Sequence, residues 1–380
     1  MRVAHSRKVV SMGRLTVVQM LPALESGGVE RGTLEVGKHL VDHGHRSIVI
    51  SAGGRMVEQL RREGSEHLAW DVGRKSPMTL LRYVGRLRRF LADESVDILH
   101  LRSRMPAWVA WLAWRGMEPA TRPRLVTTVH GLYSVNAYSA IMAKGERVIV
   151  VSKTVRDYVL QNYPRTEPGR ITVIPRGIDP AAYPWGYRPT ESWLADWRTQ
   201  YPQLAGRKVI TLPGRITRLK GHEDFIKLIG RLKAAGGPVH GLVVGGAEAK
   251  KQAYLAELEN KVAVAGLAQD ITFTGQRGDL REIMAVSDLV LSLSNKPESF
   301  GRTVLEALSM GVPVVGYDHG GVGEQLQLLH SRGLVGLGDL EGLLRQCRSA
   351  LGMGRIALAS SPPTLEHMLS DTLAVYESFF

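Results

Sequence analysis

The alternation of short apolar runs with amphipathic stretches constrains the fold of this chain more than any other feature of its sequence. It runs from about residue 15 to residue 175 and starts again near residue 209. Buried parallel strands have continuous apolar sequences and are connected by helices, so the alternation predicts two α/β domains with doubly wound parallel sheets. The expected strands lie at 15–20, 47–51, 98–101, 124–129, 148–151 and 171–174 in the first half, and at 209–212, 239–244, 271–273, 289–293 and 312–315 in the second.

The alternation is interrupted where prolines crowd together between Pro180 and Pro202, which indicates a connection between domains. A helical pattern at the end of the chain has no strand after it, so we expect this helix to dock back on a part that is already folded, the N-terminal domain. The predicted parts are an N-terminal domain over residues 1–180, a linker over 181–206, a C-terminal domain over 207–362 and the final helix over 363–380.

The composition restricts the cellular compartment in which such a chain is expected. Cys347 is the single cysteine, which excludes an intrachain disulfide and a cysteine-based metal site. No apolar run approaches the ~20 residues that a membrane-spanning helix needs. The basic residues 1–8 are not followed by the apolar stretch of a secretory signal. We therefore expect a reduced, cytoplasmic protein.

Positive charge is concentrated in the first half of the chain. The net charge is +13, and residues 1–180 hold 28 basic and 16 acidic side chains, whereas residues 181–380 hold 21 and 20. Such an asymmetry predicts an anionic partner for the first half: nucleic acid, anionic lipid, or a phosphorylated or acidic substrate.

Two loops have the composition of phosphate-binding loops. The paired Gly27 and Gly28 precede the first helix and would let backbone N–H groups approach an anion, although a plain tight turn explains them equally well. In the second half, Arg215 and Lys220 lie five residues apart before Gly221, which opens a helix. Arginine and lysine at this spacing are suited to phosphate oxygens, and the alternative is two solvated surface cations.

The most informative segment is residues 296–315. Glu298 precedes a predicted helix, and Glu306 follows about one and a half turns into it, with seven residues between them. Glu298 can face a ligand together with the N–H groups at the start of the helix. Glu306 can accept hydrogen bonds from two neighbouring hydroxyls, and it lies among apolar residues where an idle charge is costly.

This segment, P-E-S-F-G-R-T-V-L-E-A-L-S-M-G-V-P-V-V, closely resembles the signature of the family 4 retaining glycosyltransferases. The resemblance implies the GT-B fold, in which two Rossmann-like doubly wound domains face each other across a cleft. It extends over nearly the whole chain, through the segments 27–28, 97–100, 128–131, 151–153, 173–179, 214–221 and 273–275.

The resemblance also implies roles for individual residues. Arg215 and Lys220 would hold the pyrophosphate of a nucleotide-sugar donor, and Glu306 would hold its ribose hydroxyls. Glu298 would contact the donor sugar, a role shared with the backbone amides of Phe300, Gly301 and Arg302.

Four further residues complete the implied site. Gly28 would let the acceptor domain approach the phosphates, His130 would lie near the sugar, and the base would be read around Gln276 and Arg277. The family needs no metal, in agreement with the absence of Asp-x-Asp in this sequence. The implied mechanism is front-face transfer with the departing phosphate as base, although a double displacement stays open. No cofactor is expected, because the nucleotide-sugar is a substrate.

Other patterns have two interpretations each. His39, His43 and His45 could form a metal cluster, but they fit better as the end of a helix that closes at Gly44, so we expect no metal site.

Residues near the predicted strand 98–101 are candidates for acceptor binding. His100, Arg102 and Arg104 could meet an anionic acceptor or simply cap the strand. Trp108, Trp111 and Trp114 recur every three residues, which favours packing over a membrane interface.

A helix expected at residues 80–91 has one apolar stripe and one basic stripe. Arg82, Arg86 and Arg89 form the basic stripe, so the helix could lie on an anionic bilayer or be an ordinary surface helix.

Together these features predict a glycosyltransferase that acts on a glycan or glycolipid at the inner face of the cytoplasmic membrane, in synthesis of lipopolysaccharide core or another surface polysaccharide. An alternative is a nucleotide-sugar epimerase of the same fold, which needs no acceptor site. A nucleic-acid-binding protein is supported only by the pI of about 9.9, so no nucleic-acid partner is expected.

Overall fold

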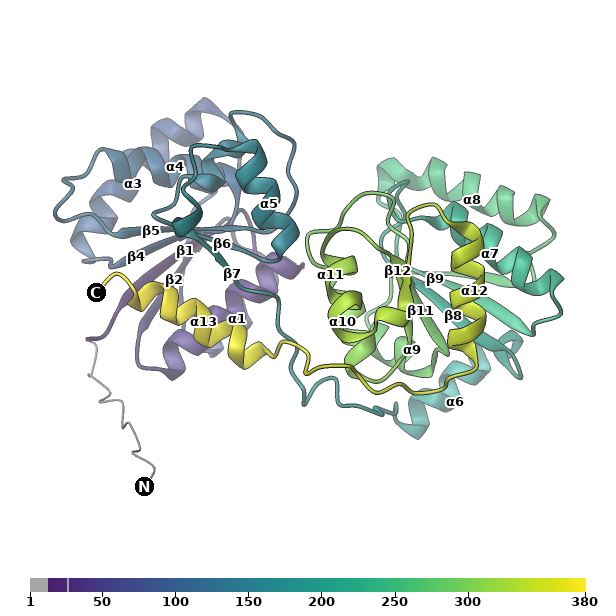
Figure 1. The fold of residues 1–380 in the computed structure, drawn as a ribbon. Helices are drawn as coiled ribbons and strands as arrows, with labels where there is room; N and C mark the ends of the chain where they lie inside the picture. Colours follow the sequence, from purple (N-terminus) through teal and green to yellow (C-terminus); the bar gives the residue numbers. More distant parts are fainter. Residues whose placement is uncertain (1–12, 26) are drawn as a thin grey trace, which may run out of the picture. The chain divides into compact units, whose positions relative to one another are not determined.

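The computed structural model describes residues 13–25 and 27–380, so the expectation about a secretory signal falls outside the described residues. Two compact units make up the chain. Unit 1 comprises the chain up to Val151, then Arg156–Ile174 and Leu369–Phe380, and unit 2 comprises Ser152–Val155 and Pro175–Met368. Each unit is built on its own parallel sheet (Figure 1).

The sheet of unit 1 has the strand order β3-β2-β1-β4-β5-β6-β7 and is parallel throughout. Every side chain of β4 is buried, as expected for a central strand covered on both faces. The strands are β1 Thr16–Met20, β2 Arg46–Ser51, β3 Glu66–Ala69, β4 Ile98–Leu101, β5 Arg124–Val129, β6 Arg147–Val150 and β7 Ile171–Val173.

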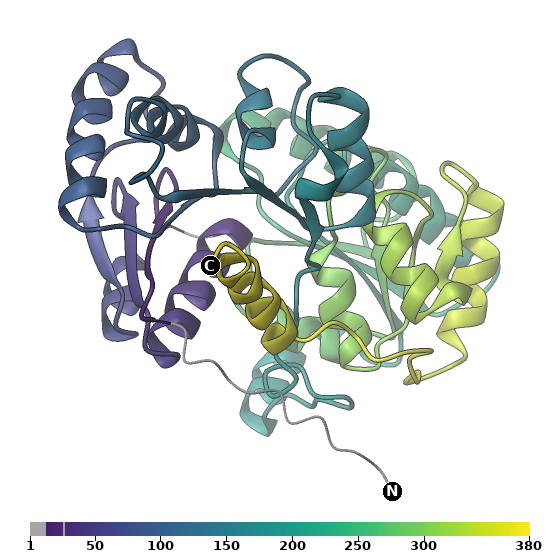
Figure 2. The same ribbon diagram turned by 60° about the vertical axis from the view of Figure 1, so that its left-hand side comes forward.

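Helices cover both faces of this sheet (Figures 1 and 2). Helices α1 and α13 lie on one face, and α3, α4 and α5 lie on the other. Helix α2 packs with α1, because Leu60 and Leu34 belong to one apolar cluster. Ser76 caps α3 by accepting a hydrogen bond from the Met78 N–H, and Pro77 follows it at the first helical position. The helices are α1 Gly28–Asp42, α2 Val57–Arg62, α3 Pro77–Asp93, α4 Arg104–Arg115, α5 Lys153–Asn162 and α13 Leu365–Glu377.

The final helix, α13, packs on unit 1 through its C-terminal part. It lies beside α1 in both views (Figures 1 and 2). The hydroxyl of Tyr376, which has no exposed surface, lies 2.7 Å from Nδ1 of His100 on β4. The end of the chain therefore completes the core of its first half.

The sheet of unit 2 has the order β10-β9-β8-β11-β12-β13 and is also parallel. The strands are β8 Lys208–Pro213, β9 Val239–Val244, β10 Ile271–Gly275, β11 Leu289–Ser292, β12 Val314–Tyr317 and β13 Leu334–Val335. The helices are α6 Glu191–Gln200, α7 His222–Ala234, α8 Gln252–Val264, α9 Leu280–Val286, α10 Arg302–Ser309, α11 Gly320–Leu329 and α12 Leu340–Leu351.

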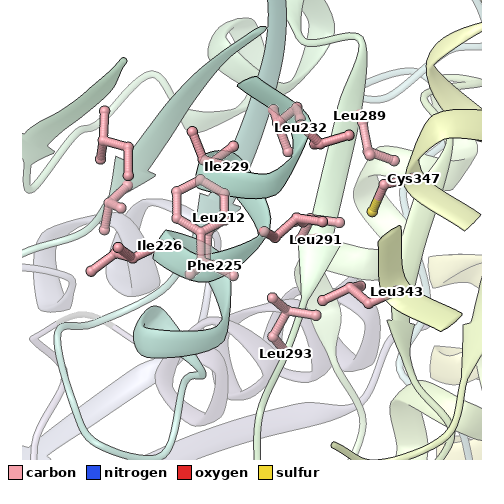
Figure 3. Close-up of a cluster of buried hydrophobic side chains, with 14 of the residues drawn as sticks. Leu212, Phe225, Ile226, Ile229, Leu232, Leu289, Leu291, Leu293, Leu343 and Cys347 are labelled. Atoms are coloured by element: carbon pink, nitrogen blue, oxygen red, sulfur yellow. The ribbon is translucent and has the colours of Figure 1, made fainter. Parts of the chain in front are cut away.

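A large apolar core lies between this sheet and helices α7, α8 and α12 (Figure 3). Phe225 of α7 has no exposed surface, and it packs near Leu212 and Leu291 of the sheet. Cys347 on α12 is buried in the same cluster, where burial raises the pKa of its thiol. The single cysteine is thus a small apolar core residue.

The expected linker over 181–206 is wrong in one respect, because this segment belongs to unit 2 and contains helix α6. Trp197 and Tyr201 pack in an apolar cluster with Ile283 of α9. The prolines lie outside the helix: Pro189 precedes its N-cap, and Pro202 follows its end. They therefore delimit a helix, and the composition alone could not distinguish that from a linker.

Two strands were missed by the sequence pattern. β3 is an edge strand with only partly buried side chains, and β13 has two residues, so neither produces an apolar run. The strand expected at 312–315 begins two residues later, at Val314. No helix in the described part of the chain is long and apolar enough to span a membrane.

Candidate functional site

The first candidate site lies at the carboxyl edge of the unit 2 sheet. Neighbouring strands β8 and β11 pair in parallel, with Leu289 opposite Ile210, and the connections leave this point in opposite directions. Ligands of open α/β sheets bind where the strand order reverses in this way. The loops that follow these two strands, 214–221 and 293–301, carry most of the residues assigned to the donor.

The two loops are bonded to each other. Asn295 donates its backbone N–H to the Leu219 carbonyl and its side-chain amide to the Arg218 carbonyl, both at 2.9 Å. Gly221, at φ 74°, ends the first loop, and a Cβ there would meet the Leu293 carbonyl oxygen at 2.0 Å. Only glycine permits this close approach, so the first loop has one position relative to the second.

An ion pair joins the loops at the centre of the site. The Lys220 ammonium lies 2.7 Å from the Glu298 carboxylate, which also accepts a hydrogen bond from the Ser294 hydroxyl. Burial alone would raise the pKa of Glu298, but Lys220 and Ser294 outweigh it and hold the pKa of the carboxyl below its usual range. Glu298 is therefore a carboxylate at neutral pH.

Arg215 lies on the same loop and is more accessible. It forms an ion pair with Glu248 at 2.9 Å, with 75% of the Arg215 side chain and 64% of the Glu248 side chain exposed. An exposed pair of this kind contributes little to stability, so a ligand with phosphate oxygens can replace Glu248 at low cost.

Helix α10 begins at the edge of the second loop. Gly301 is its N-cap at φ 87°, where a Cβ would lie 2.6 Å from Val322. The side-chain amide of Gln325 on α11 donates to the carbonyls of Phe300, Gly301 and Gly321. These bonds fix the backbone of the loop just before the helix.

One turn later, α10 carries Glu306, which is 8% exposed. Arg302 lies on the same face of the helix, with its Nε 3.6 Å from the Glu306 carboxylate. A buried carboxylate close to the open edge of a sheet can accept hydrogen bonds from two hydroxyls of a ligand.

Gln276 and Arg277 follow β10, at the outer strand of the same sheet. The Arg277 guanidinium forms an ion pair with Asp279 at 2.7 Å and lies 5.8 Å from the ring of Trp197 on α6. The Arg277 side chain is thus held by contacts within the protein, whereas the Gln276 side chain is exposed to solvent.

In unit 1, Gly28 opens α1 after the N-cap Gly27, and His130 follows β5. The His130 N–H donates to the Tyr133 hydroxyl at 3.3 Å. Both residues lie at the carboxyl edge of the unit 1 sheet, where the loops of an open sheet bind ligands.

Direct acceptor binding by His100 and Arg102 is not what the structure shows. His100 is fully buried between the Tyr376 and Thr128 hydroxyls, and Arg102 is 3% exposed and donates to Gln19 at 2.9 Å. Both side chains point into the core that α13 covers, so we withdraw them from the acceptor site.

Arg104 occupies a different position, half-exposed at the start of α4. Its guanidinium lies 4.6 Å from the ring centre of Tyr133 and 5.4 Å from that of Tyr138. It remains a candidate for acceptor binding.

The tryptophan stripe of α4 serves packing in part. Trp114 is buried and donates to the Pro123 carbonyl, while Trp108 is half-buried and donates to the Tyr138 carbonyl.

Two of the three histidines near the end of α1 lie side by side, with the ring centres of His39 and His43 4.0 Å apart. His43 is the C-cap of the helix, whereas Nδ1 of His45 accepts a hydrogen bond from the Leu15 N–H, 3.1 Å away. Within residues 13–25 and 27–380, no three His, Cys, Asp or Glu side chains are placed to hold a metal ion.

Sequence reasoning missed the residues that support the site. Ser294, Asn295 and Gln325 position Glu298, the two loops and the start of α10. Ser294 and Asn295 could have been found as polar residues directly after a buried strand, but nothing in the sequence connects Gln325 with Gly301.

Comparisons with known proteins cover both halves of the chain. The family model described as Glycosyltransferase Family 4 matches residues 26–182, and the model described as Glycosyl transferases group 1 matches residues 195–351. N-acetyl-alpha-D-glucosaminyl L-malate synthase of Bacillus anthracis is 25% identical over 338 residues, which are 86% of this chain and 84% of that protein.

Solved structures match over nearly their whole length. A glycosyltransferase from Rickettsia africae ESF-5 is 28% identical, with a TM-score of 0.83 over 97% of this chain and 99% of that one. The Anabaena protein HepE in complex with UDP and glucose has a TM-score of 0.78 at 21% identity, over 96% of this chain and 100% of that one.

Proposed function

The chain is a member of the family 4 glycosyltransferases and has the GT-B fold, and on that premise we propose that it moves a sugar from a nucleotide-sugar donor to a glycan or glycolipid acceptor with retention of configuration. The observation that carries this proposal is the Lys220–Glu298 ion pair at the reversal point of the unit 2 sheet, with Arg215 beside it on the same loop.

The proposed chemistry depends on charge at the leaving group. When the sugar leaves, the nucleoside diphosphate gains negative charge, and fixed cations close to it lower the barrier. Lys220 and Arg215 are cations on a loop that Asn295 and Gly221 hold in place. The N-terminal end of α10 adds a partial positive charge at the same edge.

The remaining donor contacts follow from the same arrangement. Glu306 is proposed to accept hydrogen bonds from the ribose hydroxyls and Glu298 to contact the sugar, together with the backbone of Phe300, Gly301 and Arg302. Gln276, with the backbone of Arg277, is proposed to contact the base.

From unit 1, Gly28 and His130 are proposed to contact the donor phosphates and the transferred sugar. The departing phosphate is proposed to take the proton from the acceptor hydroxyl on the face that it leaves, with no metal or cofactor.

A panel of UDP-, GDP- and ADP-sugars tests the donor proposal. A donor present at one hundred times its dissociation constant should stabilise the protein by ~2.7 kcal/mol, which a thermal shift detects. Failure of every nucleotide-sugar to stabilise the chain would contradict the proposal.

Two further measurements test the proposed mechanism. Transfer activity should be unchanged in the presence of EDTA, and the anomeric configuration of the product tests whether the configuration is retained. A new nucleotide-sugar without an acceptor product would show the epimerase instead.

We further propose that the acceptor is a glycolipid reached from an anionic membrane, as in lipopolysaccharide core or other surface-glycan synthesis, and that the enzyme is cytoplasmic and peripheral to that membrane. Helix α3 supports this proposal, because Met78 and Leu81 are 66% and 78% exposed on its outer face. Arg82, Arg86 and Arg89 are exposed beside them. Exposed apolar side chains flanked by arginines are suited to the surface of an anionic bilayer.

A further inference from the structure

Basic side chains of unit 1 fall into two groups according to their partners. Some are neutralised by carboxylates, for example Arg46, which lies 2.6 Å from both Glu66 and Glu94. Another group on α3, α4 and the adjoining loops has no ion pair among the described residues. It includes Arg74, Lys75, Arg82, Arg86, Arg88, Arg89, Arg104, Arg115, Arg122 and Lys144.

Two members of the second group converge on one aromatic ring. The Lys75 ammonium and the Arg104 guanidinium each lie 5.4 Å from the ring centre of Tyr138. Arg104 also lies 4.6 Å from the ring of Tyr133 and donates to the Ser139 hydroxyl at 3.2 Å. Aromatic faces hold these cations in place but do not neutralise them, as a carboxylate would.

The cluster lies at the edge of the sheet where ligands bind. Lys75, Arg104 and Tyr133 follow the carboxyl ends of β3, β4 and β5, which share one edge because the strands are parallel. The Tyr133 hydroxyl accepts a hydrogen bond from the His130 N–H, so the cluster adjoins the residue expected near the transferred sugar.

The chemistry of the cluster is specific. A guanidinium presents a planar fork to the oxygens of a phosphate or carboxylate, and an ammonium adds a second point charge. The half-exposed rings of Tyr133 and Tyr138, which hold these cations, add apolar surface beside them that suits the C–H side of a sugar ring. A neutral sugar would leave two uncompensated cations unused.

We propose that Lys75, Arg104, Tyr133 and Tyr138 form the acceptor-recognition site, and that the acceptor is a sugar or polyol that carries a phosphate or carboxylate group. This inference rests on the proposed function, since it assigns the acceptor to unit 1. The cluster is distinct from the exposed face of α3, to which the membrane is assigned.

Calorimetric titration of the full chain tests the proposal with four probes: glucose 6-phosphate, glucuronate, inorganic phosphate and neutral glucose. We expect the anionic probes to bind at millimolar concentrations and glucose to bind at least tenfold more weakly. Arg104→Gln and Lys75→Gln should each weaken the anionic probes about tenfold, since hydrogen bonds to charged groups contribute on this scale.

Arg74→Gln is the matched control, because Arg74 is an exposed neighbouring cation that lies over no ring. It should leave probe binding unchanged. Lys220→Ala separates the two anion sites. Binding that survives this substitution belongs to unit 1, and binding that disappears belongs to the loop 214–221, here called the donor loop.

Three results would overturn the inference: no anionic probe binds outside the donor loop, glucose binds as well as glucose 6-phosphate, or Arg104→Gln alters binding to anionic vesicles but not to the probes. Failure of the donor panel is a separate outcome. It would contradict the proposed glycosyl transfer from a nucleotide-sugar even if unit 1 still binds the anionic probes.

Discussion

At the residue scale, the proposed donor site combines one partly buried ion pair with one solvent-exposed ion pair. Lys220 and Glu298 are partly buried and hold each other, whereas Arg215 and Glu248 are exposed to solvent. The buried pair has a fixed geometry, and the exposed arginine can turn to an arriving phosphate. A pyrophosphate would thus meet one positioned cation and one mobile cation.

Lys220→Ala and Glu306→Ala should each remove most transfer activity while the chain stays folded. Loss of Lys220 removes charge stabilisation of the leaving group, for which a single positioned donor contributes about 3–4 kcal/mol elsewhere, so kcat should fall at least a hundredfold. Loss of Glu306 removes hydrogen bonds to the donor ribose and should act mainly through KM. Steady-state kinetics with the donor found by the thermal-shift panel separate these two effects.

Arg218→Gln is the matched control for this prediction. Arg218 belongs to the same loop, but its side chain pairs with Glu257 and lies 4.4 Å from the ring of Tyr254. This variant should retain near-normal kcat/KM. A kcat/KM close to that of the parent in Lys220→Ala or Glu306→Ala would remove that residue from the site.

The sequence motifs select residues whose proposed roles depend on their neighbours in the chain. Glu298 and Glu306 are recognisable because loop, helix start and helix face follow each other within a few residues. The acceptor assignment of His100 was wrong because its partner Tyr376 is 276 residues away. No local pattern shows that a distant helix will cover a strand end.

At the element scale, α13 is attached to unit 1 by a buried chain of hydrogen bonds. The Tyr376 hydroxyl, His100 and the Thr128 hydroxyl follow each other at 2.7 and 2.6 Å. Tyr376→Phe should lower the free energy of unfolding by about 1–3 kcal/mol, because it removes the buried hydrogen bond between the Tyr376 hydroxyl and the His100 ring. Denaturant unfolding of the two proteins measures the difference.

Tyr254→Phe is a suitable control for the loss of a hydroxyl. Tyr254 is 6% exposed, and its hydroxyl makes no hydrogen bond with the described residues. We expect the free energy of unfolding to change by no more than about 0.5 kcal/mol, as is usual for a substitution that breaks no buried hydrogen bond and leaves no cavity. Equal effects of the two substitutions would show that the bond to His100 does not fasten α13.

Helix α3 should bind anionic membranes through its outer face. Each basic side chain near such a surface contributes ~1 kcal/mol, so the triple variant Arg82→Gln, Arg86→Gln, Arg89→Gln should sediment much less with anionic vesicles than the parent does. Binding should also weaken as salt shortens the screening length. Binding to neutral vesicles and affinity for the donor are the two references. Neither should differ between the parent and the triple variant.

A second variant tests the apolar part of this face. Leu81→Ser removes an exposed side chain without altering charge, and it should weaken vesicle binding further when combined with the triple variant. If the triple variant binds anionic vesicles as well as the parent, α3 is an ordinary surface helix.

The elements that sequence analysis missed share a physical cause. β3 gains its order from pairing with β2, whose side chains are largely buried, so its own sequence needs no apolar run. α6 is bounded by prolines that mark its ends, and Trp197 reaches the core from a segment that otherwise looks like a linker. In each case long-range packing decides what local composition leaves open.

At the scale of the whole molecule, the distribution of charge can be compared with what each half of the chain is proposed to bind. Residues 181–380 have nearly balanced charge, with cations in one loop at the end of the sheet. Residues 74–122, which include α3, α4 and their loops, hold ten basic and four acidic side chains, half of the surplus of the first half. A small anionic donor needs few cations, whereas a membrane and an anionic acceptor can use many. The predicted division into a donor half and an acceptor half therefore agrees with the distribution of charge.

Stability should fall below neutral pH because two histidines are buried uncharged. His222 and His240 are each 1% exposed, and burial lowers the pKa of both to about 4. In the unfolded chain a histidine has a pKa of about 6.5, so between pH 6.5 and pH 4 the unfolded state binds more protons than the folded one. The contribution of the two uncharged histidines to the free energy of unfolding is therefore fully present above pH 6.5 and is lost as the pH falls from 6.5 to 4.

Between pH 7.5 and pH 5 the two histidines should together cost roughly 4 kcal/mol, about 2 kcal/mol each. Carboxylates such as Glu298, whose pKa is lowered in the folded chain, add to the loss only closer to pH 4.5 and below, so this window isolates the histidines. Denaturant unfolding at the two pH values measures the slope. His240→Gln, which lies on β9 and away from the loop 214–221, should remove about 2 kcal/mol of the loss. His45, His67 and His330, whose pKa values burial also lowers, contribute to the loss in both proteins. An unchanged slope would show that His240 is not the group that titrates.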